Sequence, residues 1–255
     1  MSDSEQSLNQ GFLETVFNSE LRDVAKDSAE VLIDSLLDDG ILKEIPIVRS
    51  VLGLAKAGIS VRDRLFLEKV MRVLSPLSEY TSEQRQEFLR SLDADEVKKA
   101  SQYLILYIDR LDSIEKTGML GKVFEAYLTG KIGYEAMLYF AHFIDSVFIL
   151  VWQGYHEAIK NWIPHRPAHG LAIATEDALA LEKVGVYIEQ TKPVLEDEYA
   201  GMSRRDRRLK GIERRLDLTD AGWEFVNVVF QPKWPETTNR GFLRNCLSVR
   251  LNRIR

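Results

Sequence analysis

Cysteine is nearly absent from this chain, since Cys246 is the only one among 255 residues. A disulfide within the chain is therefore impossible, because that bond needs two thiols. Disulfides belong to oxidising compartments, so a single cysteine favours a reducing one. Cys246 also lacks the histidine and asparagine context of a nucleophilic cysteine. We therefore expect a cytoplasmic protein without cysteine chemistry.

Long uncharged apolar runs are also missing. In the segment Ile45–Val61, eight aliphatic residues contribute about −2.4 to −4.8 kcal/mol to insertion, whereas Arg49 and Lys56 together cost about +5 to +7 kcal/mol. The segment Ala136–Trp152 is 17 residues long and contains two polar residues near its middle, which makes it short for a membrane span. Residues 1–10 have no basic region typical of a signal peptide. The sequence predicts no transmembrane helix.

Motifs for catalysis, metal binding and nucleotide binding are lacking as well. The pairs Gly121–Lys122 and Gly130–Lys131 have neither the upstream glycine nor the following Ser or Thr of a phosphate loop. His165 and His169 have the spacing of two metal ligands on a helix, but Pro167 between them prevents a regular helix. We expect no catalytic residues, no metal and no cofactor, and therefore a protein that is not an enzyme.

What the sequence does contain is a short segment rich in apolar and small residues, Ile41–Val61. Pro46 suits the first turn of a helix, and apolar residues then recur at helical spacing. Small residues at intervals of three and four let another backbone approach closely, and here they are Ser50, Gly53, Ala57 and Ser60. We predict a helix-packing seam. It has three interpretations: the core of a bundle, a surface for a partner helix, or a face that inserts into a membrane surface.

Helical periodicity dominates the chain up to about Trp162. The passage Ile163–Gly170 breaks it with two prolines and a glycine, which are typical of a domain boundary. We therefore predict a helical bundle domain in residues 1–162 and a smaller α+β domain in residues 171–255. The expected fold class is mostly α.

The smaller domain begins with an expected helix from Glu176 to about Gln190, capped by Thr175. A loop, a basic run and the strand-like Leu216–Leu218 follow, and then a helix from Asp220 capped by Thr219. This order resembles the wing half of winged-helix domains, in which a helix ends in a Gly-apolar step, a hairpin follows and an L-T-x-x-G helix closes the unit. The residues that match those positions are Gly185, Thr219 and Gly222. The resemblance implies a winged-helix-like module.

The layout of the whole chain is similar to uncharacterised bacterial proteins with a helical body, an IP-x-V-x-x-x-x-G-L-x-K-A-G segment and a winged-helix-like end. That segment runs here from Ile45 to Gly58. The resemblance implies an accessory protein of bacterial phage defence or stress response. It implies no activity and no catalytic residues.

Charge is unevenly distributed along the chain. Residues 203–255 contain 13 Lys/Arg and 6 Asp/Glu, an excess of +7. Subtraction from the totals of 34 and 39 leaves 21 and 33 in residues 1–202, or −12. An acidic body with a basic end can bind its own other half, a partner or nucleic acid. The densest basic run is Arg204, Arg205, Arg207, Arg208, Lys210, Arg214 and Arg215.

These residues predict contacts with nucleic acid or another anion, since Lys and Arg neutralise phosphates. The alternative is a solvated loop that pairs with the acidic body. Our first functional hypothesis is a non-enzymatic interaction or regulatory protein that associates with a protein partner or with a second copy of itself. The other hypotheses are a nucleic-acid-binding regulator that uses the basic run, and an effector that attaches reversibly to a membrane surface without spanning it.

Overall fold

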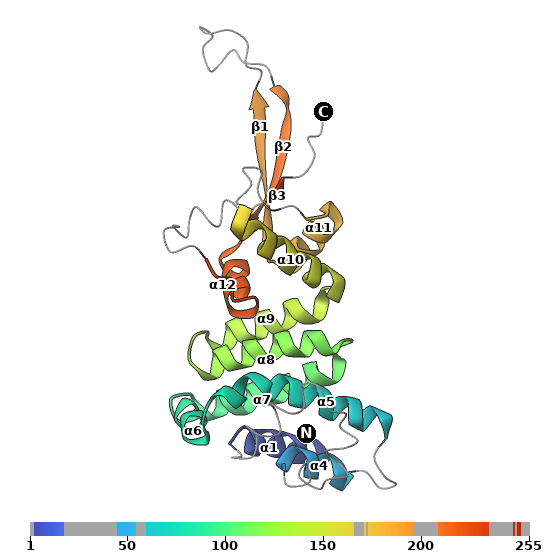
Figure 1. The fold of residues 1–255 in the computed structure, drawn as a ribbon, viewed down its shortest axis with the longest axis vertical. Helices are drawn as coiled ribbons and strands as arrows, with labels where there is room; N and C mark the ends of the chain where they lie inside the picture. The colour runs from blue at the N-terminus through green and yellow to red at the C-terminus, as the bar shows by residue number, and fades with distance from the viewer. Residues whose placement is uncertain are drawn as a thin grey trace. The chain divides into compact units, whose positions relative to one another are not determined.

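The computed structural model describes residues 3–17, 45–54, 60–165, 171, 173–195, 209–234, 247 and 249–250. The protein is mostly helical, as the periodicity predicts. It divides into two compact units, residues 1–145 and 146–255 (Figure 1). The division comes earlier in the chain than the expected boundary at Ile163–Gly170, because the helix before that passage packs within the second unit.

The first unit is built from helices. They are α1 (Asp3–Phe17), α4 (Pro46–Leu54), α5 (Val61–Leu74), the short 3-10 helix η2 (Ser75–Glu79), α6 (Ser82–Arg90), α7 (Ala94–Arg110), α8 (Ile114–Leu128) and α9 (Tyr134–Ser146).

Side-chain caps define where several of these helices begin. The sequence offers Thr81 or Ser82 as the cap of a helix, and the structure shows Thr81 and Gln84 forming a capping box at the start of α6. Ser60 and Asp63 form a second capping box at the start of α5. The sequence places Ser60 in the same helix as Ser50 and Gly53, and that expectation is wrong. Ser60 has an extended backbone and is the N-cap residue of the next helix, α5.

Helix α8 lies deep in the first unit, and Leu120, Val123 and Phe124 are fully or almost fully buried. It packs against α5 at Gly121, where an added Cβ would lie 2.6 Å from the carbonyl oxygen of Val73. This glycine therefore permits a backbone approach that a larger residue would block. The buried face of α8 thus forms the centre of the helical core.

The second unit contains three helices and a small sheet within the described residues. These are α10 (Ile149–His165), α11 (Thr175–Lys183), β1 (Tyr187–Leu195), β2 (Leu209–Leu218), α12 (Asp220–Val229) and β3 (Val249–Arg250). The sheet is antiparallel in the order β1-β2-β3. Thr219 caps α12, as predicted.

Two helices differ from the sequence-based expectation. The apolar periodicity from Tyr134 to about Asn161 predicts one long helix. The structure interrupts this helix after Ser146, and α9 and α10 belong mainly to different cores. The helix expected to reach Gln190 ends at Lys183, because Gly185 takes a φ of +88° and the chain continues as β1. The N-cap residue of this helix, α11, is Ala174 and not Thr175.

An aromatic cluster forms the core of the second unit. Trp152 and Tyr155 on α10 lie 4.9 Å from Phe225 and 5.8 Å from Phe230, respectively, between ring centroids. Tyr155 also packs edge-on against Tyr187 of β1, at 6.0 Å. Aromatic packing therefore joins α10 to both the sheet and α12.

Within the described ranges, no single helix is long and apolar enough to cross a membrane. Helices α9 and α10 meet the requirements of length and composition only as a pair with a sharp bend between them.

Candidate nucleic-acid interface

The base of the β1–β2 hairpin is a tight junction with α12. Thr219 donates its hydroxyl to the carbonyl of Gly185 at 2.7 Å and accepts the amide of Gly222 at 2.8 Å. The amide of Thr219 also donates to the carbonyl of Val186 at 3.1 Å. Gly222 lies against that same carbonyl, where a Cβ would overlap it. The three residues that carry the winged-helix resemblance therefore meet at one point.

Buried tyrosines fix the hairpin to the aromatic core. The hydroxyl of Tyr187 lies 3.1 Å from that of Tyr155 and donates to the carbonyl of Leu247 at 3.0 Å. Burial raises the pKa of both tyrosines well above the usual value, because a phenolate would be desolvated there. Leu216 and Leu218 of β2 are buried beside them. The first part of the hairpin is thus held rigidly.

Beyond this base the hairpin leaves the core. Ile188 is 51% exposed, and Gln190 and Thr191 are exposed as well. Figure 1 shows β1 and β2 continuing together past the helices of their own unit. The register runs from Tyr187 opposite Leu218 as far as Leu195 opposite Leu209. The outer part is a two-stranded arm, which we define as residues 190–195 and 209–215.

Part of the predicted basic run lies on this arm. Lys210, Arg214 and Arg215 belong to β2, where Arg214 is opposite Thr191 and Arg215 is opposite Gln190. The register shifts between Val194 and Leu195, so that Lys210 has no opposite residue in β1. The remaining predicted residues lie outside the described part of the chain, and they are Arg204, Arg205, Arg207 and Arg208.

Strand β3 adds one basic residue, Arg250, beside the arm. Arg250 lies directly opposite Arg215, and Val249 lies opposite Leu216. Like charges in opposite positions of a sheet repel each other. Asp217 offsets part of this charge, since its Oδ1 is 2.6 Å from Nε of Arg215.

Sequence reasoning found the basic run, and the winged-helix resemblance implies that this run lies in or next to the wing. Sequence reasoning missed strand β1 and the pairing of the C-terminal stretch with β2. One signal was present, because Leu247 and Val249 alternate with polar residues, and both are buried. Which strand they would join depends on Tyr187 and its hydrogen bond to Leu247, and no local pattern encodes that contact.

The four residues of the predicted helix-packing seam do not form one packing surface among the described residues. Ser50 contacts α1, where its hydroxyl donates to the carbonyl of Ser7 at 3.1 Å. Gly53 is exposed, and a Cβ added there would meet no atom of the described part of the chain within 4 Å. Ala57 lies outside the described residues, and Ser60 caps α5.

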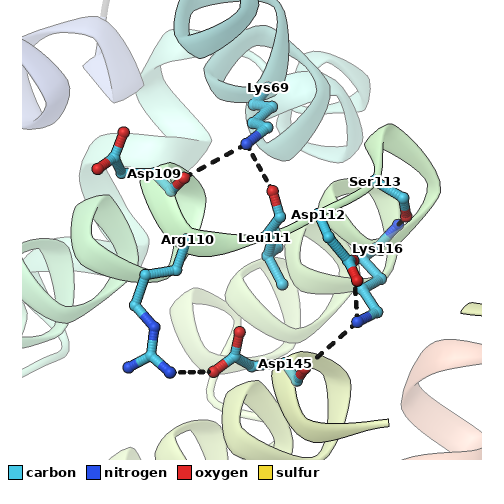
Figure 2. Close-up of polar contacts among 8 residues, drawn as sticks. All are labelled: Lys69, Asp109, Arg110, Leu111, Asp112, Ser113, Lys116 and Asp145. Carbon is cyan, nitrogen blue, oxygen red and sulfur yellow. Dashed lines mark hydrogen bonds and ion pairs between the residues drawn. The ribbon is translucent and has the colours of Figure 1, made fainter. Parts of the chain in front are cut away.

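A second polar cluster joins four segments of the first unit (Figure 2). Nζ of Lys69 donates to the carbonyls of Asp109 and Leu111, at 3.4 Å and 2.6 Å. Nζ of Lys116, a residue that is 2% exposed, binds Asp112 Oδ1 at 3.0 Å and the carbonyl of Asp145 at 3.2 Å. Arg110 binds the Asp145 carboxylate at 2.7 Å. Both ammonium groups satisfy main-chain carbonyls at the ends of α7 and α9, so this cluster stabilises the fold.

The histidines form no described metal centre. Among the residues that the structure describes, no group of three or more His, Cys, Asp or Glu side chains is arranged to hold a metal ion. His142 is exposed, and the carboxylate of Asp145, its neighbour three residues on, is bound to Arg110. His169 lies outside the described residues.

Comparison of the chain with protein-family models, with curated proteins and with solved structures gives no match.

Proposed function

We propose that the protein is a non-enzymatic interaction protein that binds nucleic acid through the basic arm of its second unit. The observation that supports this is the pairing of β2 with β3, which puts Arg215 and Arg250 opposite each other at the base of a projecting hairpin. The order of α11, β1, β2 and α12 suits a winged-helix-like module whose wing makes the contact. A regulatory role in bacterial defence or stress is compatible with such a contact.

The charge distribution between the units supports the same proposal. Residues 146–255 contain 17 Lys/Arg and 14 Asp/Glu, or +3, which leaves 17 and 25 in residues 1–145, or −8. The acidic unit repels phosphate, so a nucleic acid approaches the other unit. Contacts of this kind release counterions and weaken steeply as salt rises.

Fluorescence anisotropy of the full-length protein with a labelled DNA duplex tests this proposal over a series of salt concentrations. We expect binding at low salt. Replacing Arg214 and Arg215 together with Ala should weaken it on the order of tenfold and reduce the salt slope by about 2, since two phosphate contacts are lost. The matched control replaces two exposed arginines of the first unit, Arg49 and Arg90, and should change affinity less than about twofold.

A charge-preserving variant separates binding from folding. Arg215→Lys keeps the positive charge near Asp217 and should retain the salt slope, whereas a loss of structure would show in the circular dichroism of both Arg215 variants. The proposal is wrong if the parent protein does not bind DNA or RNA at low salt. It is also wrong if the arm variant and the control variant lose affinity equally.

Association through α4 is a second candidate function, and the exposed Gly53 favours it. A glycine inside a helix costs roughly 1 kcal/mol relative to alanine, and among the residues that the structure describes no contact within 4 Å requires a glycine at that position. A partner backbone that approaches closely would require it. Light scattering coupled to size exclusion tests this: an assembly that Gly53→Leu dissociates supports the idea, and a monomer that the substitution leaves unchanged ends it.

Attachment to a membrane surface has less support from α4. The side chains of Ile47 and Val48 are fully buried, and Val51 is 6% exposed. The apolar arc of the helix is thus used within the first unit. We therefore do not extend the proposal to membranes.

A further inference from the structure

We infer that a second copy of this chain packs on the outward face of α7, with the two α7 helices antiparallel. The outward face comprises the exposed residues of α7 between Asp95 and Arg110. It lies in the first unit, so this self-association is independent of the nucleic-acid contact proposed for the second unit.

The centre of the outward face is apolar. Tyr103 and Leu106 lie three positions apart on one side of the helix, and both are exposed. The other side of α7 is already used, because Val97, Leu104 and Ile108 are buried in the first unit. Tyrosine is enriched at protein interfaces, where its ring buries much area at one point. The centre of the face therefore suits a protein partner.

Charged residues surround this centre, and their charges cancel. Three are acidic and three are basic, and they are Asp95, Glu96, Lys98, Lys99, Asp109 and Arg110. A face without net charge has no general attraction for a polyanion or for a strongly basic partner. The order of the charges along the helix therefore decides which partner fits.

That order is complementary to itself when the helix is turned end for end. Glu96 and Arg110 stand seven positions before and after Tyr103, on one line along the helix. In an antiparallel pair centred on Tyr103, each Glu96 therefore meets the Arg110 of the other copy. On the other flank of the face, Lys98 comes close to Asp109. A parallel pair would place every charge beside its own equivalent, which is repulsive. A two-fold contact uses the same patch on both copies, so a second copy fits this face.

Arg110 can make this contact while it keeps its bond to Asp145. Its Nη2 donates to the Asp145 carboxylate at 2.7 Å (Figure 2). A guanidinium has five N–H donors, and this side chain is 68% exposed, so donors remain for a second carboxylate. Asp109 likewise binds Arg62 within the chain, and a carboxylate can accept several hydrogen bonds. The bond to Asp145 thus holds Arg110 at the end of α7, where the contact needs it.

The length of α7 sets the strength of the contact. The helix has 17 residues, which corresponds to about 25 Å. A contact confined to one pair of helices is smaller than a standard protein interface, and small interfaces are weak and reversible. We therefore expect dimers at protein concentrations on the order of 0.1 mM.

Sedimentation equilibrium of the full-length protein over a range of concentrations tests the inference. Leu106→Lys should raise the dissociation constant of the dimer at least tenfold, because it puts a charge into the apolar centre and close to Lys99 of the other copy. The matched control is Leu150→Lys in the second unit, where the leucine is also exposed, by 60% against 57% for Leu106. It should change the dissociation constant less than about twofold.

Charge reversal tests the antiparallel arrangement. Glu96→Lys and Arg110→Glu should each raise the dissociation constant about tenfold, since two attractive pairs in the dimer become repulsive. The double variant exchanges the two charges and should return to within about threefold of the parent protein. If the two residues acted independently in some other contact, the double variant would associate more weakly than either single variant. Circular dichroism of every variant verifies that it is folded.

Several outcomes would overturn the inference. They are a protein that stays monomeric up to about 1 mM, equal effects of Leu106→Lys and Leu150→Lys, and a double variant weaker than both single variants. An assembly that Gly53→Leu dissociates and Leu106→Lys leaves intact would also overturn it, because association would then use α4. None of these results affects the proposed nucleic-acid binding, which the variant at Arg214 and Arg215 tests separately.

Discussion

The backbone of Gly11 in α1 lies directly against the side chain of Ser50 in α4. A Cβ on Gly11 would overlap the Ser50 hydroxyl and would lie 3.0 Å from the carbonyl oxygen of Pro46. Ser50 in turn donates to the carbonyls of Ser7 and Pro46, each at 3.1 Å. Helices therefore do approach closely at α4, as the seam predicts, but the glycine that allows it is Gly11 of α1 and not Gly53 of α4.

Two glycines of this helix pair should respond oppositely to alanine. Gly11→Ala should destabilise the protein by about 1–3 kcal/mol, because the new methyl group forces α1 and α4 apart. Gly53→Ala should stabilise it by about 1 kcal/mol, since the position is open and alanine is the better helix former. Urea unfolding of both variants provides the measurement. Equal effects of the two substitutions would contradict the packing described for Gly11.

Thr15 of α1 should be required for the start of α4. Its hydroxyl accepts a hydrogen bond from the amide of Ile47 at 2.9 Å and donates to the carbonyl of Gly11 at 2.6 Å. Ile45, which directly precedes α4, has no polar side chain that could cap this helix, and Thr15 takes that role. Thr15→Val removes the acceptor and should cost about 1–2 kcal/mol of unfolding free energy. Thr15→Ser keeps the hydroxyl and should recover most of that loss in the same denaturation experiment.

Arg85 should be among the most sensitive positions of the first unit. It is 1% exposed, and its guanidinium donates to the carbonyls of Val16, Leu77 and Tyr80 at 2.6, 3.2 and 2.5 Å. Arg85→Met would leave these buried acceptors without their donor, at a cost on the order of 3 kcal/mol. Arg90→Met, at the exposed end of the same helix, should change stability by less than about 0.5 kcal/mol. Similar midpoints for the two variants would show that Arg85 does not join these segments.

The two cations that bind Asp145 should differ in their importance. Lys116→Ala removes a buried side chain together with its bonds to Asp112 and to the Asp145 carbonyl, and should cost on the order of 2 kcal/mol. Arg110 is 68% exposed, so Arg110→Ala should cost less than about 1 kcal/mol. Thermal unfolding of both variants at one pH gives the comparison, and a larger loss for Arg110 would refute it.

Stability should fall in alkaline solution partly because of Tyr80. Burial and the hydrogen bond to Glu125, 2.7 Å long, raise the pKa of Tyr80 from 10.0 to about 12. As pH rises, Tyr80 therefore loses its proton first in the unfolded chain. Its contribution to the free energy of unfolding is complete below about pH 10 and is lost by about pH 12. Tyr80→Phe should flatten the decline between these values in urea unfolding experiments.

The matched control for that experiment is Tyr139→Phe, at a position that is 63% exposed. It should leave the alkaline decline as steep as in the parent protein. If both variants flatten the curve equally, the hydrogen bond between Tyr80 and Glu125 is not the cause.

Features that depend on neighbouring residues could be predicted from the sequence. The cap at Thr219 was found, and the cap of α6 was narrowed to Thr81 or Ser82, because a cap requires particular residue types a few positions apart. The mostly helical character followed from apolar periodicity. Of the candidate interface, the sequence revealed the basic residues, since charge density is visible without a fold.

Features that depend on distant residues were missed or misplaced. The seam was assigned to four residues of one helix, but close approach at α4 requires Gly11, far away in the sequence. Similarly, Thr15 substitutes for a cap that Ile45 cannot supply. The break between α9 and α10 was not expected, because an apolar stretch looks continuous even when its two halves belong to different cores.

The sequence by itself determined that this protein is mainly helical, that Thr219 caps one of its helices, and that positive charge concentrates near its C-terminus. These properties arise from residues within a few positions of one another. Only the tertiary structure decided that Lys210, Arg214 and Arg215 belong to strand β2 and that Arg250 lies opposite Arg215. That pairing depends on the buried Tyr187, which holds Leu247 from 60 residues away.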